Sequence, residues 1–339
     1  MEDEFISVGK VPYSILQKIL DLNSVSERKE VIVGPSLGED AAVIRIDDTD
    51  YVIVVHTDPI TEAFSKLGWL SINVAANDIA VTGARPSWFT VTILMPPGSI
   101  GKDIINLASE ISSAARSLGG VVVGGHTEVS PGISKPILIT TAIGVTNTNT
   151  FIRTGGAKPG SFVFQVKPAA LEGTAIIGHD FYDKLISRGV PEHIIVNARG
   201  FINEISIVEP AVALAEKRLV ESMHDPTEGG LIGGLIELAR ASNVSLNIED
   251  SKIIVRKETM IISEALNINW MKLVSSGAII GTLKPEYVDE ASNIAEKTGF
   301  EFSIIGKVLR YSGFDVFLEK EDKFYNGYIR DEISGLFDK

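Results

Sequence analysis

Three aspartates, Asp40, Asp58 and Asp78, lie in separate segments of the first half of the chain, each at the edge of an apolar run. Carboxylates that converge without nearby cations repel one another unless a divalent metal neutralises them. Mg²⁺ prefers oxygen ligands and commonly keeps phosphate oxygens in its shell. The three residues are therefore candidate ligands of a magnesium–nucleotide site, although aspartate is also common in ordinary turns.

Asp78 belongs to the stretch LGWLSINVAANDIAVTGARP, residues 67–86, around which the chain is organised. Small and apolar residues recur there at intervals of three and four, which predicts a helix pressed closely against another element. Asn77 and Asp78 interrupt this apolar pattern. Asn77 is either a core amide satisfied by the protein itself or, with Asp78, part of a polar site.

Two glycine-rich runs are further candidates for ligand contacts. In GGVVVGGHTEV, residues 119–129, we expect a strand that runs into a turn at Gly124 and Gly125. That turn would let the backbone approach a ligand and would present His126, Thr127 and Glu128.

The second run is SMHDPTEGGLIGGLIELA, residues 222–239, in which Asp225 precedes a helix expected to begin at Thr227. Four glycines stand in the first two turns of that helix. Its free amides would suit a phosphate, but an aspartate cap with tight helix packing explains the same residues equally well.

Composition excludes several classes of function. The net charge of −13 argues against nucleic-acid binding, and the absence of cysteine excludes disulfides, thiolate metal sites and a thiol nucleophile. The five histidines show no zinc-type pairing, and no G-x-S-x-G, P-loop or dinucleotide fingerprint occurs. An acidic N-terminus and the lack of a long apolar run predict a cytoplasmic protein without a membrane partner.

Strands and helices alternate along the chain with hairpin-like neighbours, which predicts an α/β protein with mixed sheets. The polar, glycine-rich segment 146–160 is the best boundary between two domains. We expect a helical segment at 1–30, an N-terminal domain at 31–150 and a C-terminal domain at 151–339. Gly9 and Lys10, just before the helix expected at 11–22, form either a phosphate-contacting loop or an ordinary turn.

Five motifs occur in the order and spacing of one superfamily: GEDAAVI (38–44), HTD (56–58), NDIAVTGARP (77–86), GGHTEV (124–129) and HDPTEGG (224–230). The chain resembles the aminoimidazole ribonucleotide (AIR) synthetase or PurM-like proteins, most of all the HypE-like hydrogenase maturation and archaeal AIR-synthase-related group. This resemblance implies a two-domain PurM-like fold. The sheet of the N-terminal domain would form a barrel with that of a second subunit, giving a homodimer, and an α/β C-terminal domain would lie beside it.

The resemblance also implies roles for individual residues. Asp40, Asp58 and Asp78 would be the Mg²⁺–ATP carboxylates, and Asp58, Asp78 and Glu128 the catalytic acids. The remaining nucleotide contacts would come from Asn77, Gly124, Gly125, His126, Thr127, Asp225 and Thr227. The family phosphorylates an oxygen or comparable nucleophile with ATP, which here implies a small-molecule or protein-borne acceptor.

This chain departs from the HypE-like pattern on the acceptor side. It lacks the C-terminal cysteine that carries the carbamoyl group, so self-carried cyanide synthesis is excluded. Glu128 replaces a lysine, the HDPTEGG motif lacks two arginines, and Ser276 replaces an acid. We therefore expect an ATP- and Mg²⁺-dependent enzyme with a changed acceptor. The alternatives are a small-molecule kinase similar to thiamine-monophosphate kinase and a nucleotide-binding partner protein without turnover.

Overall fold

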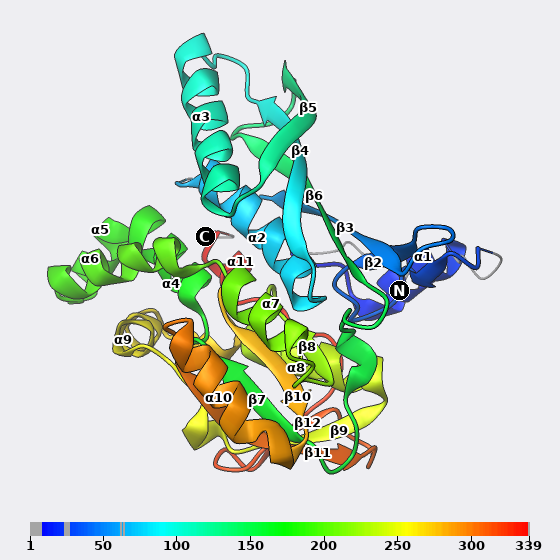
Figure 1. Cartoon of the computed structure of the whole chain (residues 1–339). Helices are drawn as coiled ribbons and strands as arrows, with labels where there is room; N and C mark the ends of the chain where they lie inside the picture. The colour runs from blue at the N-terminus through cyan, green and yellow to red at the C-terminus, as the bar shows by residue number, and fades with distance from the viewer. Residues whose placement is uncertain (1–8, 24–27, 62, 64, 338–339) are drawn as a thin grey trace.

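The structure is a computed structural model that describes residues 9–23, 28–61, 63 and 65–337. Each half of the chain contains its own sheet (Figure 1), as expected for an α/β protein with mixed sheets. Residues 1–8 and 24–27 of the expected N-terminal helical segment lie outside the described residues, as do the last two residues of the chain.

The first sheet has six strands in the order β1-β2-β3-β6-β4-β5. Only β4 and β5 are parallel neighbours, and the other pairs are antiparallel. The strands and the helices of this half are β1 Val31–Val33, β2 Ala42–Arg45, β3 Tyr51–Ile60, β4 Arg85–Met95, β5 Val121–Val129, β6 Ile137–Asn147, α1 Tyr13–Leu22, α2 Leu67–Val81 and α3 Gly101–Ser117.

Helix α2 is the core of this half, because all but one of its residues are buried. It packs on β3 and β6. Its small side chains permit a close approach, and Gly144 of β6 meets it without a side chain of its own. A Cβ atom at Gly144 would lie 2.6 Å from Cγ2 of Ile79, so any larger residue there would push α2 away from the sheet.

The second sheet has seven strands in the order β13-β12-β9-β11-β7-β10-β8, with helices on both faces. Neighbouring residues of β10 show this arrangement, since Ile279 and Ile280 belong to different hydrophobic cores. One core contains α7 and α10, and the other contains α8. The elements are β7 Phe162–Val166, β8 Ser222–His224, β9 Val244–Ile248, β10 Ile279–Leu283, β11 Phe302–Arg310, β12 Val316–Leu318, β13 Lys323–Tyr325, α4 Leu171–Asp180, α5 Tyr182–Ser187, α6 Glu192–Gly200, α7 Val208–Glu216, α8 Gly230–Ser242, α9 Lys257–Leu266, α10 Val288–Lys297 and α11 Ser334–Phe337.

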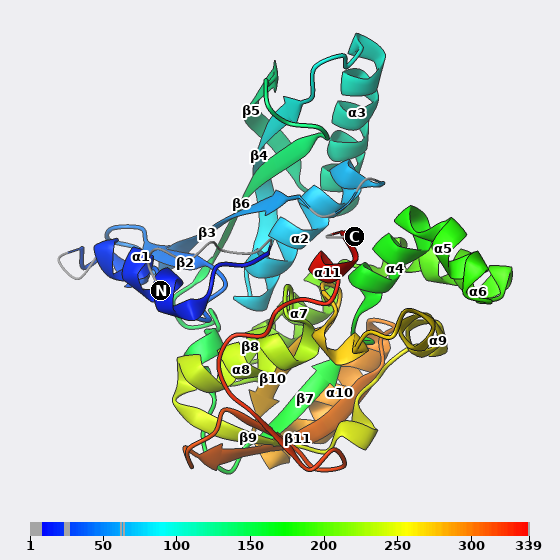
Figure 2. The same ribbon diagram turned by 180° about the vertical axis from the view of Figure 1, so that it is seen from behind.

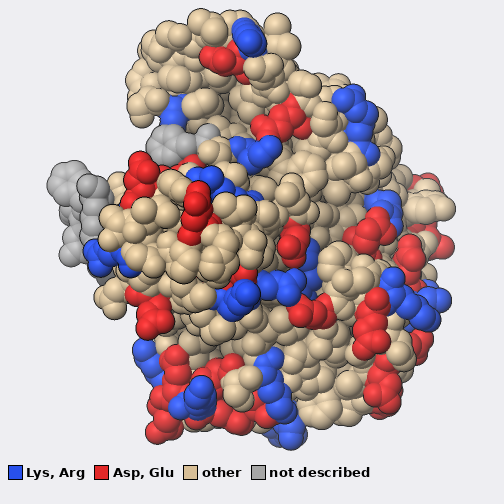
Figure 3. All heavy atoms as spheres, turned by 90° about the vertical axis from the view of Figure 1, so that its left-hand side faces the viewer, with Lys and Arg blue, Asp and Glu red and all other residues tan. Residues whose placement is uncertain are grey.

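The two halves meet around α2. The short C-terminal helix α11 lies between them, and the turned view in Figure 2 shows the same position. Acidic and basic side chains are mixed over the face shown in Figure 3. This surface lacks the continuous basic patch that a nucleic-acid binder would present. Within the described part of the chain, no helix has the length and apolar character needed to span a membrane.

The loop at residues 204–207 is held from both halves. Lys167 is 2% exposed, and its Nζ atom donates to the backbone carbonyls of Glu204 and Ser206, the latter at 2.7 Å. From the other side, the Nδ2 atom of Asn77 donates to the carbonyl of Ile205 at 3.0 Å. The buried amino group of Lys167 therefore helps to fix the contact between α2 and the second half.

Lys167 should give the protein a specific pH dependence of stability. Burial lowers the pKa of Lys167 to about 7, far below its value of 10.5 in an unfolded chain. Between these pH values the unfolded chain binds more protons at this residue, so stability rises with pH. Urea unfolding from pH 7 to 10 should therefore show a slope up to about 1.4 kcal/mol per pH unit steeper in the wild type than in Lys167→Met. Equal slopes would show that Lys167 stays charged in its buried position.

Candidate carboxylate and nucleotide site

Four aspartates from both halves of the chain converge at one place. Carboxylate oxygens of Asp40, Asp78 and Asp225 lie within 4.8 Å of one another, and atoms of His56, Asp58 and Asp78 meet the same criterion. Asp40 precedes β2, Asp58 lies on β3, Asp78 on α2, and Asp225 follows β8. The structure therefore brings together the three predicted metal ligands and Asp225.

Asp78 and Asp225 carry the least compensated charge in this cluster. They are 6% and 1% exposed. Neither oxygen of Asp225, nor Oδ2 of Asp78, accepts a hydrogen bond from another described residue. Burial, together with the neighbouring carboxylates, raises the pKa of both groups well above the usual range for aspartate. Buried, unpaired oxygens in this number are the ligands that a divalent cation requires.

Asp40 differs because it is tied into a buried chain of ion pairs. Its Oδ1 atom lies 2.5 Å from Nδ1 of His224, and Nε2 of His224 lies 3.2 Å from Oε2 of Glu237. The other carboxylate oxygen, Oε1 of Glu237, accepts from Lys10 at 2.6 Å and from Tyr13 at 3.1 Å. This chain connects the N-terminal segment, α8 and the loop before β2.

The charges in this chain stabilise one another. Burial opposes the imidazolium form of His224, but Asp40 and Glu237 outweigh burial and raise its pKa to about 10. Burial likewise opposes ionisation of Glu237, yet Lys10 and His224 lower its pKa to about 2. Both cations therefore pair directly with Asp40 and Glu237. Lys10 also attracts Asp78, and His224 also attracts Asp225, but these weaker interactions leave the pKa of both aspartates raised.

A cavity of about 700 Å³ opens beside these carboxylates. Its volume lies within the range of ordinary small-molecule sites. The residues that line it include Leu16 and Leu20 of α1, and also Leu37, Ser276, Ile333 and Phe337. The predicted residue Thr227 also lines the cavity, and the Gly9–Lys10 segment lies at its wall. The donor set and the cavity together fit a nucleotide with a hard divalent cation.

The expected phosphate contact at Asn77 is corrected by the structure. Both ends of its amide are used by the protein, because Nδ2 donates to the carbonyl of Ile205 and Oδ1 accepts from the amide of Ile207 at 3.0 Å. Asn77 is fully buried. It is therefore a core amide that joins the two halves, which was the structural alternative at this position.

The turn expected at Gly124 and Gly125 is also wrong, because both residues lie inside β5. A shift of register lies just before them, because Phe89 of β4 pairs with Val122 and Thr90 pairs with Gly124, which leaves Val123 as the extra residue of β5. A Cβ atom at Gly125 would lie 2.0 Å from the carbonyl oxygen of Val91. The glycine is therefore required for strand packing.

His126, Thr127 and Glu128 follow on this strand and are exposed. Nε2 of His126 lies 3.1 Å from Oε2 of Glu128, and a hydrogen bond from Ser130 lowers the pKa of Glu128, with a smaller effect of His126. β5 is three strands away from β3 in the sheet, about 14 Å at the usual spacing. Within one chain, Glu128 and its neighbours therefore do not join the aspartate cluster.

The glycines of the HDPTEGG run mainly allow close packing against neighbouring backbone. Helix α8 begins at Gly230, and the amide of Gly229 donates to Oδ2 of Asp331 at 2.7 Å, so this amide is used by the protein. A Cβ atom at Gly230 would lie 2.7 Å from the backbone of Leu273. Asp225 does not cap the helix, and its carboxylate remains in the aspartate cluster.

Sequence reasoning missed three polar residues of the site. His56 stands two positions before Asp58, and alternation along a strand could have placed both on one face. His224 directly precedes Asp225, but its two ion pairs are tertiary. Glu237 lies 227 positions from Lys10, and no local pattern reveals this pair.

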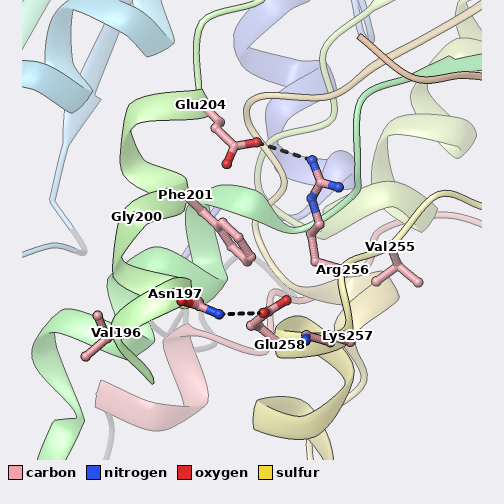
Figure 4. Close-up of a pocket in the computed structure, with 9 residues that line it drawn as sticks. All are labelled: Val196, Asn197, Gly200, Phe201, Glu204, Val255, Arg256, Lys257 and Glu258. Atoms are coloured by element: carbon pink, nitrogen blue, oxygen red, sulfur yellow. Dashed lines mark hydrogen bonds and ion pairs between the residues drawn. The ribbon is translucent and has the colours of Figure 1, made fainter. Parts of the chain in front are cut away.

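A second pocket, of about 670 Å³, lies among α6, the 3-10 helix Phe201–Glu204 and α9 (Figure 4). Its polar side chains already contact one another, because Asn197 donates to Glu258 at 3.1 Å and Arg256 lies 3.4 Å from Glu204. It contains none of the predicted site residues. The aspartate cavity is therefore the candidate functional site.

Comparisons with known proteins identify a family for each half of the chain. The family profile "AIR synthase related protein, N-terminal domain" matches residues 38–146, and the corresponding C-terminal domain profile matches residues 196–319. A putative hydrogenase expression/formation protein of Methanocaldococcus jannaschii is 27% identical over 314 residues, covering 88% of both chains. Carbamoyl dehydratase HypE of Rhizobium leguminosarum bv. viciae is 26% identical, covering 80% of this chain and 75% of that protein.

Among solved structures, AaThiL complexed with AMPPCP and TMP has the same fold, with a TM-score of 0.72. The superposition covers 94% of this chain and 98% of the AaThiL chain, and the two sequences are 18% identical. At this level of identity the likeness shows the fold and leaves the reaction open.

Asp78→Asn should separate metal binding from folding. The substitution keeps the shape of the side chain and removes one of several repelling charges, so stability in EDTA should equal or exceed that of the wild type. Affinity for ATP in the presence of Mg²⁺ should fall at least tenfold, or about 1.4 kcal/mol. Thermal unfolding and titration calorimetry measure the two effects, with the exposed Asp47→Asn as the matched control. Unchanged nucleotide affinity would make Asp78 a structural residue.

Proposed function

Because the chain belongs to the AIR synthase related, PurM-like superfamily, we propose that it is an ATP- and Mg²⁺-dependent enzyme that phosphorylates an oxygen of an acceptor. The observation that carries this proposal is a pair of buried aspartates with unpaired carboxylate oxygens. Asp78 lines a cavity of nucleotide size, and a carboxylate oxygen of Asp225 lies within 4.8 Å of one of Asp78. Such oxygens need a cation, and a phosphate chain would complete its coordination.

Each residue of the cluster would have a positional role. Asp40, Asp78 and Asp225 would hold the cation, and Asp58 would contribute from β3 at the same edge. Bound Mg²⁺ would neutralise charge on the phosphates and polarise the transferred group. The His224–Glu237–Lys10 chain would keep Asp40 in place and hold the N-terminal segment against the cavity. Catalysis would then depend on positioning and electrostatics, without a covalent enzyme intermediate.

The acceptor side supports a reaction different from self-carried cyanide synthesis. The chain contains no cysteine, so it has no thiol that could carry a carbamoyl group. Ser276 is 1% exposed and lines the cavity, and its hydroxyl has no hydrogen-bond partner among the described residues. A neutral hydrogen-bonding group therefore stands where the related HypE-like sequences have an acid. We propose that the acceptor is a separate small molecule or a group carried on another protein.

Turnover of ATP tests the proposed function directly. We expect the purified protein with Mg²⁺ to convert ATP to ADP and phosphate, slowly alone and faster with a suitable acceptor. Asp78→Asn should lose this activity, whereas Asp47→Asn should retain it. Stimulation by thiamine monophosphate with formation of a diphosphate would instead assign the small-molecule kinase reaction. Tight ATP binding without turnover under any of these conditions would support a nucleotide-binding partner protein.

We further propose that the protein forms a homodimer through β5. All nine residues of this edge strand are exposed, including Val121, Val123 and Val129 at 50%, 57% and 51%. An exposed apolar edge strand of this length is usually covered by another chain. In such a dimer, Glu128 and its neighbours could contribute only to the aspartate site of the second subunit.

Light scattering at micromolar concentration should report twice 36.5 kDa. Val123→Lys should shift the mass to that of one chain, because it places a charge in the covered strand. The matched control is Val196→Lys, a residue of α6 that is 54% exposed, and it should stay dimeric. A wild-type monomer would contradict the proposed dimer.

A further inference from the structure

The linker between the two halves holds the loop that carries Asp40. Oγ1 of Thr154 donates to Oδ2 of Asp40 at 2.8 Å. The preceding residue, Arg153, donates from Nε and Nη2 to Oε1 of Glu39 at 3.0 and 2.7 Å. Two consecutive residues of the linker therefore bind two consecutive residues of the loop before β2.

This part of the linker is itself fixed to the second half. Thr154 begins the short 3-10 helix Thr154–Gly156. Oγ of Ser242, the last residue of α8, donates to the backbone carbonyl of Thr154 at 3.3 Å. A Cβ atom at Gly156 would lie 1.9 Å from the carbonyl oxygen of Glu221, so the two backbones are in direct contact. Thr154 is therefore a rigid point from which Asp40 can be held.

The hydroxyl of Thr154 has an unusual acceptor for a buried threonine of this chain. Thr154 is 2% exposed. Other buried threonines bond to neutral groups. Thr82 donates to the carbonyl of Ile79, and the hydroxyls of Thr174 and Thr259 bond to each other. Thr154 instead donates to a carboxylate of the candidate metal site, 114 positions away in the sequence.

The bond from Thr154 restrains a rotation that the ion pair of Asp40 leaves open. His224 holds Oδ1 of Asp40 at 2.5 Å, but rotation of a carboxylate about its Cβ–Cγ bond is only weakly restricted. A second bond, at Oδ2, fixes the carboxylate plane. About two of its four acceptor positions remain for a cation. One oxygen of Asp40 lies within 4.8 Å of oxygens of Asp78 and Asp225, with which that cation would be shared.

We propose that Thr154 is a positioning residue of the metal site, whose hydroxyl orients the carboxylate of Asp40 toward the cation. The inference rests on the proposed function for the presence of that cation. Thr154 does not line the cavity, so it acts through Asp40 alone. Hydrogen-bond partners of this kind typically change metal affinity roughly 10–100-fold when they are removed. The linker between the halves thus becomes part of the site.

Binding of Mn²⁺ to the nucleotide-free, full-length protein measures this role without ATP turnover. Thr154→Val keeps the shape of the side chain and removes the hydroxyl. Electron paramagnetic resonance of free Mn²⁺ during a titration with MnCl₂ should show about tenfold weaker binding in this variant than in the wild type. Thr154→Ser restores the donor, so it should bind Mn²⁺ as the wild type does. Circular dichroism verifies that each variant is folded.

Thr259→Val is the matched control. It also removes a buried hydroxyl from a hydrogen bond, the 2.9 Å contact with Thr174, and neither of these residues lines the cavity. Both valine variants should lower the melting temperature in EDTA, but only Thr154→Val should weaken Mn²⁺ binding. A purely structural Thr154 would change the melting temperature alone.

Three results would overturn the inference: wild-type Mn²⁺ affinity in folded Thr154→Val, equal weakening in Thr259→Val, or a Thr154→Ser variant that binds as weakly as Thr154→Val. If Thr154→Val does not fold, Thr154→Ala provides the same test, because it lacks the hydroxyl and is smaller than threonine. Asp78→Asn separates the two proposals. If it loses Mn²⁺ binding while Thr154→Val does not, only this inference fails. If the wild type binds no Mn²⁺, or Asp78→Asn binds it unchanged, the carboxylate site itself is contradicted, and the inference fails with it.

Discussion

Repulsion among Asp40, Asp58, Asp78 and Asp225 is the constraint on which the rest of the structure depends. Asp40 is the best compensated of the four, because it pairs at 2.5 Å with His224, which Glu237 holds from the opposite side. Asp78 and Asp225 are buried without such compensation. Rigid elements must therefore hold these carboxylates together against their repulsion. A bound cation would remove that repulsion and complete the cluster.

The scaffold supplies that rigidity from both halves of the chain. Helix α2 packs closely on β3 and β6, which fixes Asp78 and Asp58 relative to each other. Asn77, the neighbour of Asp78, binds the backbone at Ile205 and Ile207, and Lys167 holds the same loop from within the second half. The loop after β8 then brings Asp225 to the cluster. The site therefore exists only while the two halves stay in contact, which makes closure of the halves and cation binding parts of one equilibrium.

Sequence patterns were sufficient to predict those elements whose structure depends on interactions between residues close in the sequence. Apolar periodicity predicted a helix within residues 67–86, and α2 covers Leu67–Val81 of this stretch. These patterns were insufficient for the start of α8, which we expected at Thr227 but which begins at Gly230, where the amide of Gly229 bonds to the distant Asp331. The same division holds at the site. The three aspartates could be grouped because each lies at the edge of an apolar segment. Asn77 and Gly125 were misread because their partners, Ile207 and Val91, lie on other elements. The Lys10–Glu237 pair spans nearly the whole first two thirds of the chain and is visible only in three dimensions.

The most direct test of the central claim is the position of the metal in a crystal of the protein grown with Mn²⁺ and a non-hydrolysable ATP analogue. Anomalous scattering locates the ion without reference to the protein density. We expect a peak about 2.2 Å from carboxylate oxygens of Asp78 and Asp225, with a phosphate oxygen of the analogue in its coordination shell. A nucleotide bound elsewhere, for example in the pocket around Arg256, with no ion at Asp78 would contradict the claim that these carboxylates form a metal–nucleotide site.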